Sequence, residues 1–134
     1  PAARSRLLSA AQRNDANLIV VTGDSHNAWA FDLPEAGRPA GVEFGGHSVT
    51  SPGFESATRG TDPAVVARGM VESSKQELRW MDTSNRGYMH LSLTPEAATN
   101  EWVFVEGTRR KSLAIKGRHR MRVRPGRKVL EMVG

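Results

Sequence analysis

The chain has 134 residues, no cysteine and a formal net charge of +5 at pH 7, a size typical of one domain or of part of a larger one. Without cysteine, a disulfide framework and a thiolate metal site are both excluded, so any metal ion must be bound by oxygen and nitrogen ligands. No run approaches the roughly 20 apolar residues of a membrane helix, and a start without Met or an apolar signal-peptide centre is expected to be processed or artificially chosen.

The basic residues are concentrated at the C-terminal end. Ten of the 19 Lys and Arg residues lie from Arg109 onward, where Glu131 is the only acidic residue, whereas residues 1–108 carry a net charge of −4. Such a distribution can serve nucleic acid, a membrane surface or an acidic surface on the same enzyme. We therefore divide the chain into residues 1–107 and a basic C-terminal hairpin or tail, residues 108–134.

The first third of the chain predicts a helix followed by strands. Apolar residues in a proline-free opening stretch predict a short helix that ends near Asn14-Asp15. The β-branched run 17–22, closed by Gly23-Asp24, predicts a buried central strand. Segments 29–33 and 40–44 then predict a hairpin across a connection that contains two prolines and a glycine.

The remaining segments predict a helix and a strand-rich half. Residues 45–61 are rich in Gly, Ser, Thr and Pro, which indicates a long irregular segment. Asp62-Pro63 resembles a helix N-cap and predicts a helix to about Lys75. Three further segments predict an antiparallel meander, and alternating arginines followed by Pro-Gly predict a basic hairpin: residues 78–82, 87–93, 100–105 and 118–132.

The sequence Gly-Asp-Ser-His directly after the first predicted strand is the strongest chemical signal. Sheets of α/β proteins present ligand groups beyond the carboxyl ends of their strands, and Asp24 and His26 stand one residue apart in such a loop. A carboxylate and an imidazole suit hard or borderline metal ions. The alternative, on spacing alone, is a turn capped by Asp24 with His26 hydrogen-bonded inside it.

Several blocks in order make the chain resemble the closing region of alkaline phosphatase D-like proteins, from about Asn17 to Gly107. Gly23 to Trp29 (Gly-Asp-Ser-His-Asn-Ala-Trp) comes first, and the other blocks follow at similar spacing: 41–44 (Gly-Val-Glu-Phe), 48–53 (Ser-Val-Thr-Ser-Pro-Gly), 85–88 (Asn-Arg-Gly-Tyr) and 91–95 (Leu-Ser-Leu-Thr-Pro). The basic tail matches no marker of this family.

The resemblance implies a calcineurin-like metallophosphoesterase fold of class α/β to α+β, of which this chain would form a partial layered β-sandwich with flanking helices. It implies hydrolysis of phosphate mono- or diesters by metal-activated water, with iron and calcium as the metal ions. Asp24 and His26 would be late ligands of the metal centre, and Asn27 or Trp29 would border the substrate.

The family's earlier ligands have no counterpart in this chain, so the resemblance also implies a missing N-terminal part as partner. With two ligands alone we expect the isolated chain to be inactive, and exposed strand edges favour self-association. An exported parent, periplasmic or secreted, would be typical of the family, although the sequence does not fix the compartment.

His47 and Arg86 are further candidates for contact with a phosphate ester. His47 lies in a loop where the family carries small hydroxyl residues, and most loop histidines are not ligands. Arg86 could face an anion, but turn chemistry alone explains its Asn-Arg-Gly segment.

The principal alternative to an enzyme is a non-catalytic module that binds a polyanion or nucleic acid through its arginine face. It is the less favoured interpretation, because the tail lacks interleaved aromatic residues. The two interpretations differ in one test: metal uptake would depend on Asp24 and His26, and polyanion binding would not.

Overall fold

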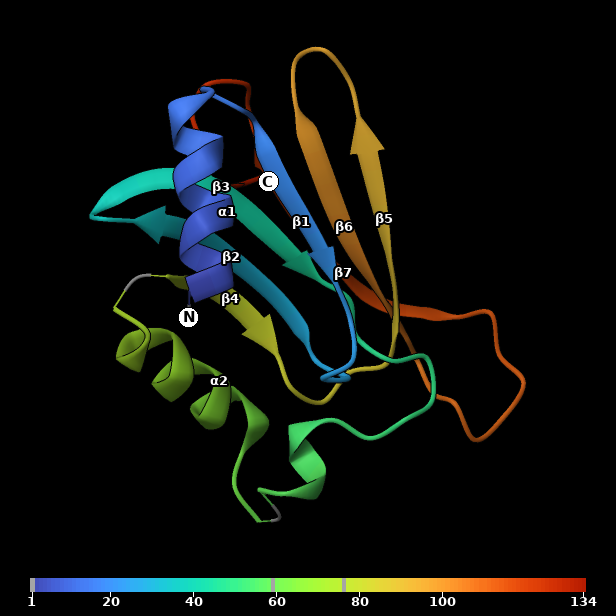
Figure 1. Ribbon diagram of the computed structural model, residues 1–134. Helices are drawn as coiled ribbons and strands as arrows, with labels where there is room; N and C mark the ends of the chain where they lie inside the picture. The colour runs from blue at the N-terminus through green and yellow to red at the C-terminus, as the bar shows by residue number, and fades with distance from the viewer. Residues whose placement is uncertain (1, 59, 76) are drawn as a thin grey trace.

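The computed structural model describes residues 2–58, 60–75 and 77–134. Two four-stranded sheets pack face to face, and the helices lie beside the first sheet (Figure 1). This confirms the predicted mixed α/β class. The elements, in chain order, are α1 (Ala2–Arg13), β1 (Leu18–Thr22), β2 (Ala28–Glu35), β3 (Arg38–Gly45), the 3-10 turn η1 (Phe54–Ser56), α2 (Pro63–Ser73), β4 (Leu78–Asp82), β5 (Gly87–Leu93), β6 (Ala98–Val105), β7 (Ile115–Val123) and β8 (Glu131–Met132).

The predicted hairpin forms the centre of the first sheet, whose strand order is β1-β3-β2-β4. Strands β2 and β3 are joined by Ala36 and Gly37, whose φ angles of 50° and 73° are those of a tight two-residue hairpin turn. The prolines were wrongly assigned to the connection: Pro34 and Pro39 face each other inside the strand ends. The strands therefore extend further than predicted, and only two residues connect them.

The prediction that residues 17–22 form a central strand is wrong. Among the described strands β1 pairs only with β3, in parallel, and therefore lies at a sheet edge. Its apolar run reflects two different contacts, since Leu18 and Val20 pack beside α1 while Ile19 packs against the core between the sheets. Periodicity does not distinguish such an edge strand from a central one.

The second sheet is an antiparallel meander in the order β5-β6-β7-β8. The predicted meander wrongly included residues 78–82, because β4 pairs with β2 in the first sheet and the chain then crosses to the second. The basic hairpin is confirmed by pairing of β7 with β8. Strand β7 also pairs with β6 from Ala98 to Val105, so the basic segment is built into the sheet.

The core lies between the two sheets. Fully buried Trp102 meets Phe44 edge to face with ring centroids 5.8 Å apart, and its indole N–H donates to the Gly45 carbonyl at 2.8 Å. Helix α1 covers the other face of the first sheet through Leu8 and Ala11. The helix predicted after Asp62 is confirmed: the Asp62 carboxylate accepts from the Ala64 N–H at 2.9 Å. No helix within the described residues is long and apolar enough to cross a membrane.

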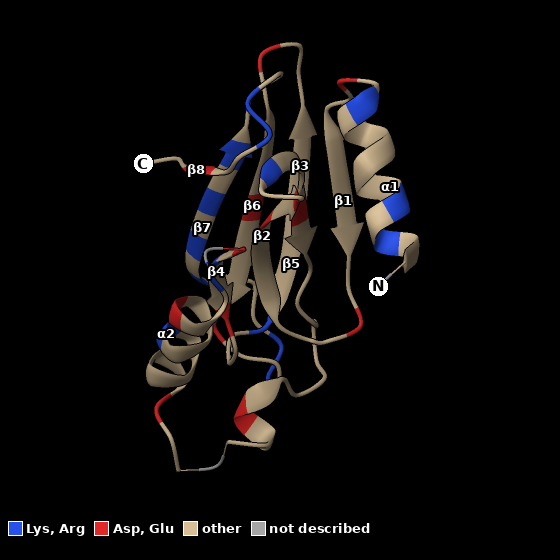
Figure 2. Cartoon of the chain, turned by 60° about the vertical axis from the view of Figure 1, so that its left-hand side comes forward, with Lys and Arg blue, Asp and Glu red and all other residues tan. Residues whose placement is uncertain are grey.

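The arginines of β7 form an exposed stripe (Figure 2). Two carboxylates offset part of this charge: Arg118 and Arg120 share Glu101, while Arg122 and Arg124, just beyond the strand, share Glu131. The stripe therefore presents less uncompensated charge than the sequence suggests. Exposed ion pairs of this kind stabilise the fold only weakly.

Candidate metal centre and its supporting loops

The loop after β1 exposes Asp24 and His26, the two predicted metal ligands. Both have left-handed backbone conformations, with φ angles of 71° and 60°. Asp and His are among the non-glycine residues that adopt this region most readily, yet each such residue costs about 1–3 kcal/mol. Neighbouring loops must therefore hold the conformation in place.

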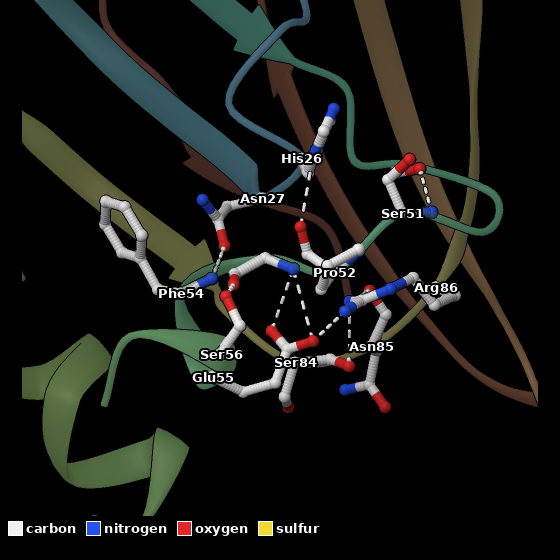
Figure 3. A network of polar contacts seen from close by, with 12 residues as sticks. His26, Asn27, Ser51, Pro52, Phe54, Glu55, Ser56, Ser84, Asn85 and Arg86 are labelled. Atoms are coloured by element: carbon white, nitrogen blue, oxygen red, sulfur yellow. Dashed lines mark hydrogen bonds and ion pairs between the residues drawn. The ribbon is translucent and has the colours of Figure 1, made fainter. Parts of the chain in front are cut away.

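One ring nitrogen of His26 is fixed by the chain. Its Nδ1 lies 3.0 Å from the carbonyl oxygen of Pro52. A carbonyl only accepts hydrogen bonds, so Nδ1 must carry a proton, and in the neutral form of the ring the lone pair lies on Nε2. Figure 3 shows the far nitrogen of the ring directed away from Pro52. This is the arrangement by which proteins commonly orient a histidine that binds metal.

Asn27 joins the same loop to the segment after β3. Its side chain is fully buried, donates to the Ser25 carbonyl at 2.7 Å and accepts from the Phe54 N–H at 3.0 Å. Trp29 donates its indole N–H to the Ser25 hydroxyl and packs edge to face on Phe54. The side chains of both residues thus hold loops together, while a border with substrate stays a prediction for them.

Gly53 permits the close approach of these loops. A Cβ at this position would lie 2.5 Å from the Asn27 Oδ1 and 3.0 Å from the carbonyl oxygens of His26 and Thr83. The amide of Gly53 also donates to both carboxylate oxygens of Glu55, at 3.2 and 3.0 Å. Only a residue without a side chain fits here.

Arg86 lies on the other side of this turn and is committed to protein partners. Its guanidinium pairs with Glu55 and donates to the carbonyls of Ser84 at 3.0 Å and Asn85 at 3.2 Å (Figure 3). Its side chain is 12% exposed, and burial lowers the pKa of Arg86 from its ordinary value. The predicted contact of Arg86 with substrate stays a prediction, and the bonds observed are structural.

His47, the remaining predicted substrate contact, is enclosed. Its ring meets Phe104 edge to face at 5.2 Å, and a Cβ on Gly87 would lie 2.8 Å from its Nε2. Burial lowers the pKa of His47, opposed by the nearby carboxylate of Asp82. The ring is therefore neutral at pH 7 and packs as part of the interior.

The donors fit a metal ion as two members of a larger ligand set. A carboxylate and a neutral imidazole are suitable ligands for iron, and the carboxylate also for calcium. Within residues 2–58, 60–75 and 77–134 no group of three or more His, Asp or Glu side chains could hold an ion. A complete centre would need ligands beyond the described part of the chain.

Comparisons with known proteins agree with the fold and then give the family. A solved structure titled "Structure of PhoD" matches with a TM-score of 0.74 at 18% identity, covering 97% of this chain and 25% of that one. The chain thus shares that fold and spans a quarter of that protein's length. No curated protein matches.

A model of the PhoD-like phosphatase family matches residues 1–102. The chain therefore belongs to the PhoD-like phosphatase family, as the ordered motif blocks predicted. The family description names phosphatases, which agrees with the resemblance seen in the sequence.

Sequence reasoning missed the residues that support His26. The Pro52-Gly53 pair belongs to one of the motif blocks, but nothing in the sequence indicates that Pro52 accepts the hydrogen bond of His26 or that Gly53 is a point of close packing. Glu55 carried no signal, because an acidic residue in a Ser- and Gly-rich loop is ordinarily solvated.

Proposed function

We propose that the chain is the C-terminal part of a metal-dependent phosphomonoesterase or phosphodiesterase in which Asp24 and His26 bind the metal centre. The observation that carries the proposal is the hydrogen bond from His26 Nδ1 to the Pro52 carbonyl, which leaves Nε2 as an exposed lone-pair donor two residues from an exposed carboxylate. Membership of a phosphatase family supports this use of the pair.

A metal ion bound there would polarise a phosphoryl oxygen and lower the pKa of the attacking water. Asp24 contributes negative charge to such a site, and His26 contributes a neutral donor of fixed tautomer. Iron and calcium, the ions implied by the family resemblance, would need several further ligands. We assign those to a polypeptide beyond this chain, which leaves the isolated chain inactive.

The test compares the 134-residue chain with the longer enzyme that the proposal requires. Both are supplied with iron and calcium and assayed with p-nitrophenyl phosphate and bis(p-nitrophenyl) phosphate. We expect no turnover by the short chain. In the longer enzyme we expect turnover that falls at least about 100-fold in Asp24→Asn and His26→Gln. Mutating residues that only hydrogen-bond to metal ligands already lowers activity about 10- to 100-fold.

Turnover by the pure 134-residue chain would overturn the claim that it is inactive alone. Unchanged turnover of both variants in the longer enzyme would remove the two residues from the centre. An Asp15→Asn variant is a matched control, because Asp15 is an exposed carboxylate in the loop at the opposite end of β1.

A further inference from the structure

We infer that Glu55 and Arg86 are positioning residues for His26, acting through the Pro52–Gly53 segment. The inference rests on the proposed function, since the orientation of the imidazole matters to catalysis only if His26 binds metal. It adds two residues from distant loops to the apparatus of the centre.

The first step is the link from Glu55 to His26. Both oxygens of the Glu55 carboxylate accept a hydrogen bond from the Gly53 N–H, which closes a tight turn between these two residues. The Pro52 carbonyl, which belongs to the peptide unit containing this N–H, accepts the hydrogen bond from His26 Nδ1 at 3.0 Å. A single rigid peptide plane thus connects the carboxylate to the imidazole.

The second step is the anchoring of Glu55 by Arg86. The guanidinium reaches Glu55 from the β4–β5 connection and is itself held by two backbone carbonyls there. That connection is stiffened by Asp82, whose carboxylate accepts from the backbone N–H groups of Ser84 at 3.0 Å and Asn85 at 2.7 Å. Charge-assisted bonds of this type are stronger than neutral ones.

The third step is that two sets of contacts hold the Pro52–Ser56 segment against the ligand loop, residues 24–27. One link is the Asn27 amide, which accepts from the Phe54 N–H. The Glu55–Arg86 pair holds the same segment from the opposite side, and the two lie around Pro52 in Figure 3. The side chains of the pair are 12% (Arg86) and 31% (Glu55) exposed, so water screens it less than a surface pair.

The experiment reads the tautomer of His26 directly in the 134-residue chain. Nitrogen-15 NMR in alkaline solution, where a histidine ring is neutral, distinguishes a protonated Nδ1 from a protonated Nε2. We expect almost pure Nδ1–H in the wild type and a mixture in Glu55→Gln and in Arg86→Gln. Binding of Mn²⁺, used as the probe ion, should weaken about 10-fold in both variants.

Two further variants separate positioning from simple loss of stability. Glu131→Gln, on β8, breaks the two ion pairs of Glu131 with Arg122 and Arg124 and should leave both the tautomer and Mn²⁺ binding unchanged. Arg86→Lys keeps the charge without the planar fork and should fall between wild type and Arg86→Gln. It also serves if Arg86→Gln does not fold.

A wild-type tautomer in folded Glu55→Gln and Arg86→Lys proteins would overturn the inference. The proposed function fails separately: unchanged turnover of Asp24→Asn and His26→Gln in the longer enzyme, with the tautomer still dependent on Glu55, would remove the metal role and keep the positioning role. A tautomer shift with weaker Mn²⁺ binding supports both.

Discussion

His47 and His119 are the histidines whose surroundings differ most from water. The ring of His119 stacks on Trp80 with centroids 3.9 Å apart, and its Nε2 is buried without a hydrogen-bond partner. Burial lowers the pKa of both histidines, and the carboxylate of Asp82 opposes the shift in each case. Both rings are therefore folded into the protein in their neutral form.

The lowered pKa values of His47 and His119 predict a loss of stability in mild acid. Their pKa values are lower in the folded than in the unfolded chain, so the unfolded chain binds more protons below about pH 6.5 and the free energy of unfolding falls as pH drops. His119→Phe preserves the stacking and removes one titrating group. We expect a smaller loss of Tm between pH 7.5 and 5.5 in this variant than in wild type.

The control for this comparison is His90→Gln, which changes an exposed histidine on β5. It should reproduce the wild-type dependence of Tm on pH. An equal loss of Tm in His119→Phe and wild type would show that protonation of His119 does not destabilise the fold.

At the scale of elements, local signals predicted most strand and helix bounds. The Asp62-Pro63 cap acts within a few residues, so the sequence reveals it directly. The Ala36-Gly37 turn was hidden inside a longer predicted connection, because the prolines on either side of it belong to the strand ends. Partner choice was harder: β4 precedes β5 in the chain but pairs with β2. That pairing depends on burying side chains between two sheets, which no local pattern records.

Replacing a glycine by alanine should have opposite effects at two positions, one at the contact between residues 24–27 and the Pro52–Ser56 segment and one inside α2. Gly53→Ala forces a Cβ against the Asn27 amide and two carbonyls, and should lower the free energy of unfolding by about 1–3 kcal/mol. Gly69→Ala lies within α2 with no atom near the new Cβ, and should raise it by about 0.5–1 kcal/mol.

Urea unfolding of the two variants beside wild type measures both changes. If Gly53→Ala leaves the free energy of unfolding unchanged, the 52–56 segment can shift to accommodate the new Cβ and does not hold Pro52 in place. Destabilisation by Gly69→Ala would instead question the exposed, helical environment of that position.

At the scale of the whole molecule, the candidate site joins three segments that are distant in sequence: 24–27, 52–55 and 84–86. The sequence made Asp24 and His26 the candidate ligands because ordered motif blocks resemble one enzyme family, and their metal role stays a prediction. It did not identify Glu55 or the structural bonds of Arg86, because these depend on the crossing from the first sheet to the second. Motifs point to exposed candidate ligands, whereas the residues that support them become visible only when the fold brings loops together.

The most direct measurement of the central claim is a crystal of the longer enzyme that contains this chain, soaked in Mn²⁺ and examined by anomalous diffraction. The account predicts an anomalous peak bound by both the Asp24 carboxylate and His26 Nε2, absent from the Asp24→Asn/His26→Gln double variant. A peak that persists in the double variant, or Mn²⁺ bound only at other carboxylates with His26 Nε2 unliganded, would contradict the assignment of these residues to the metal centre.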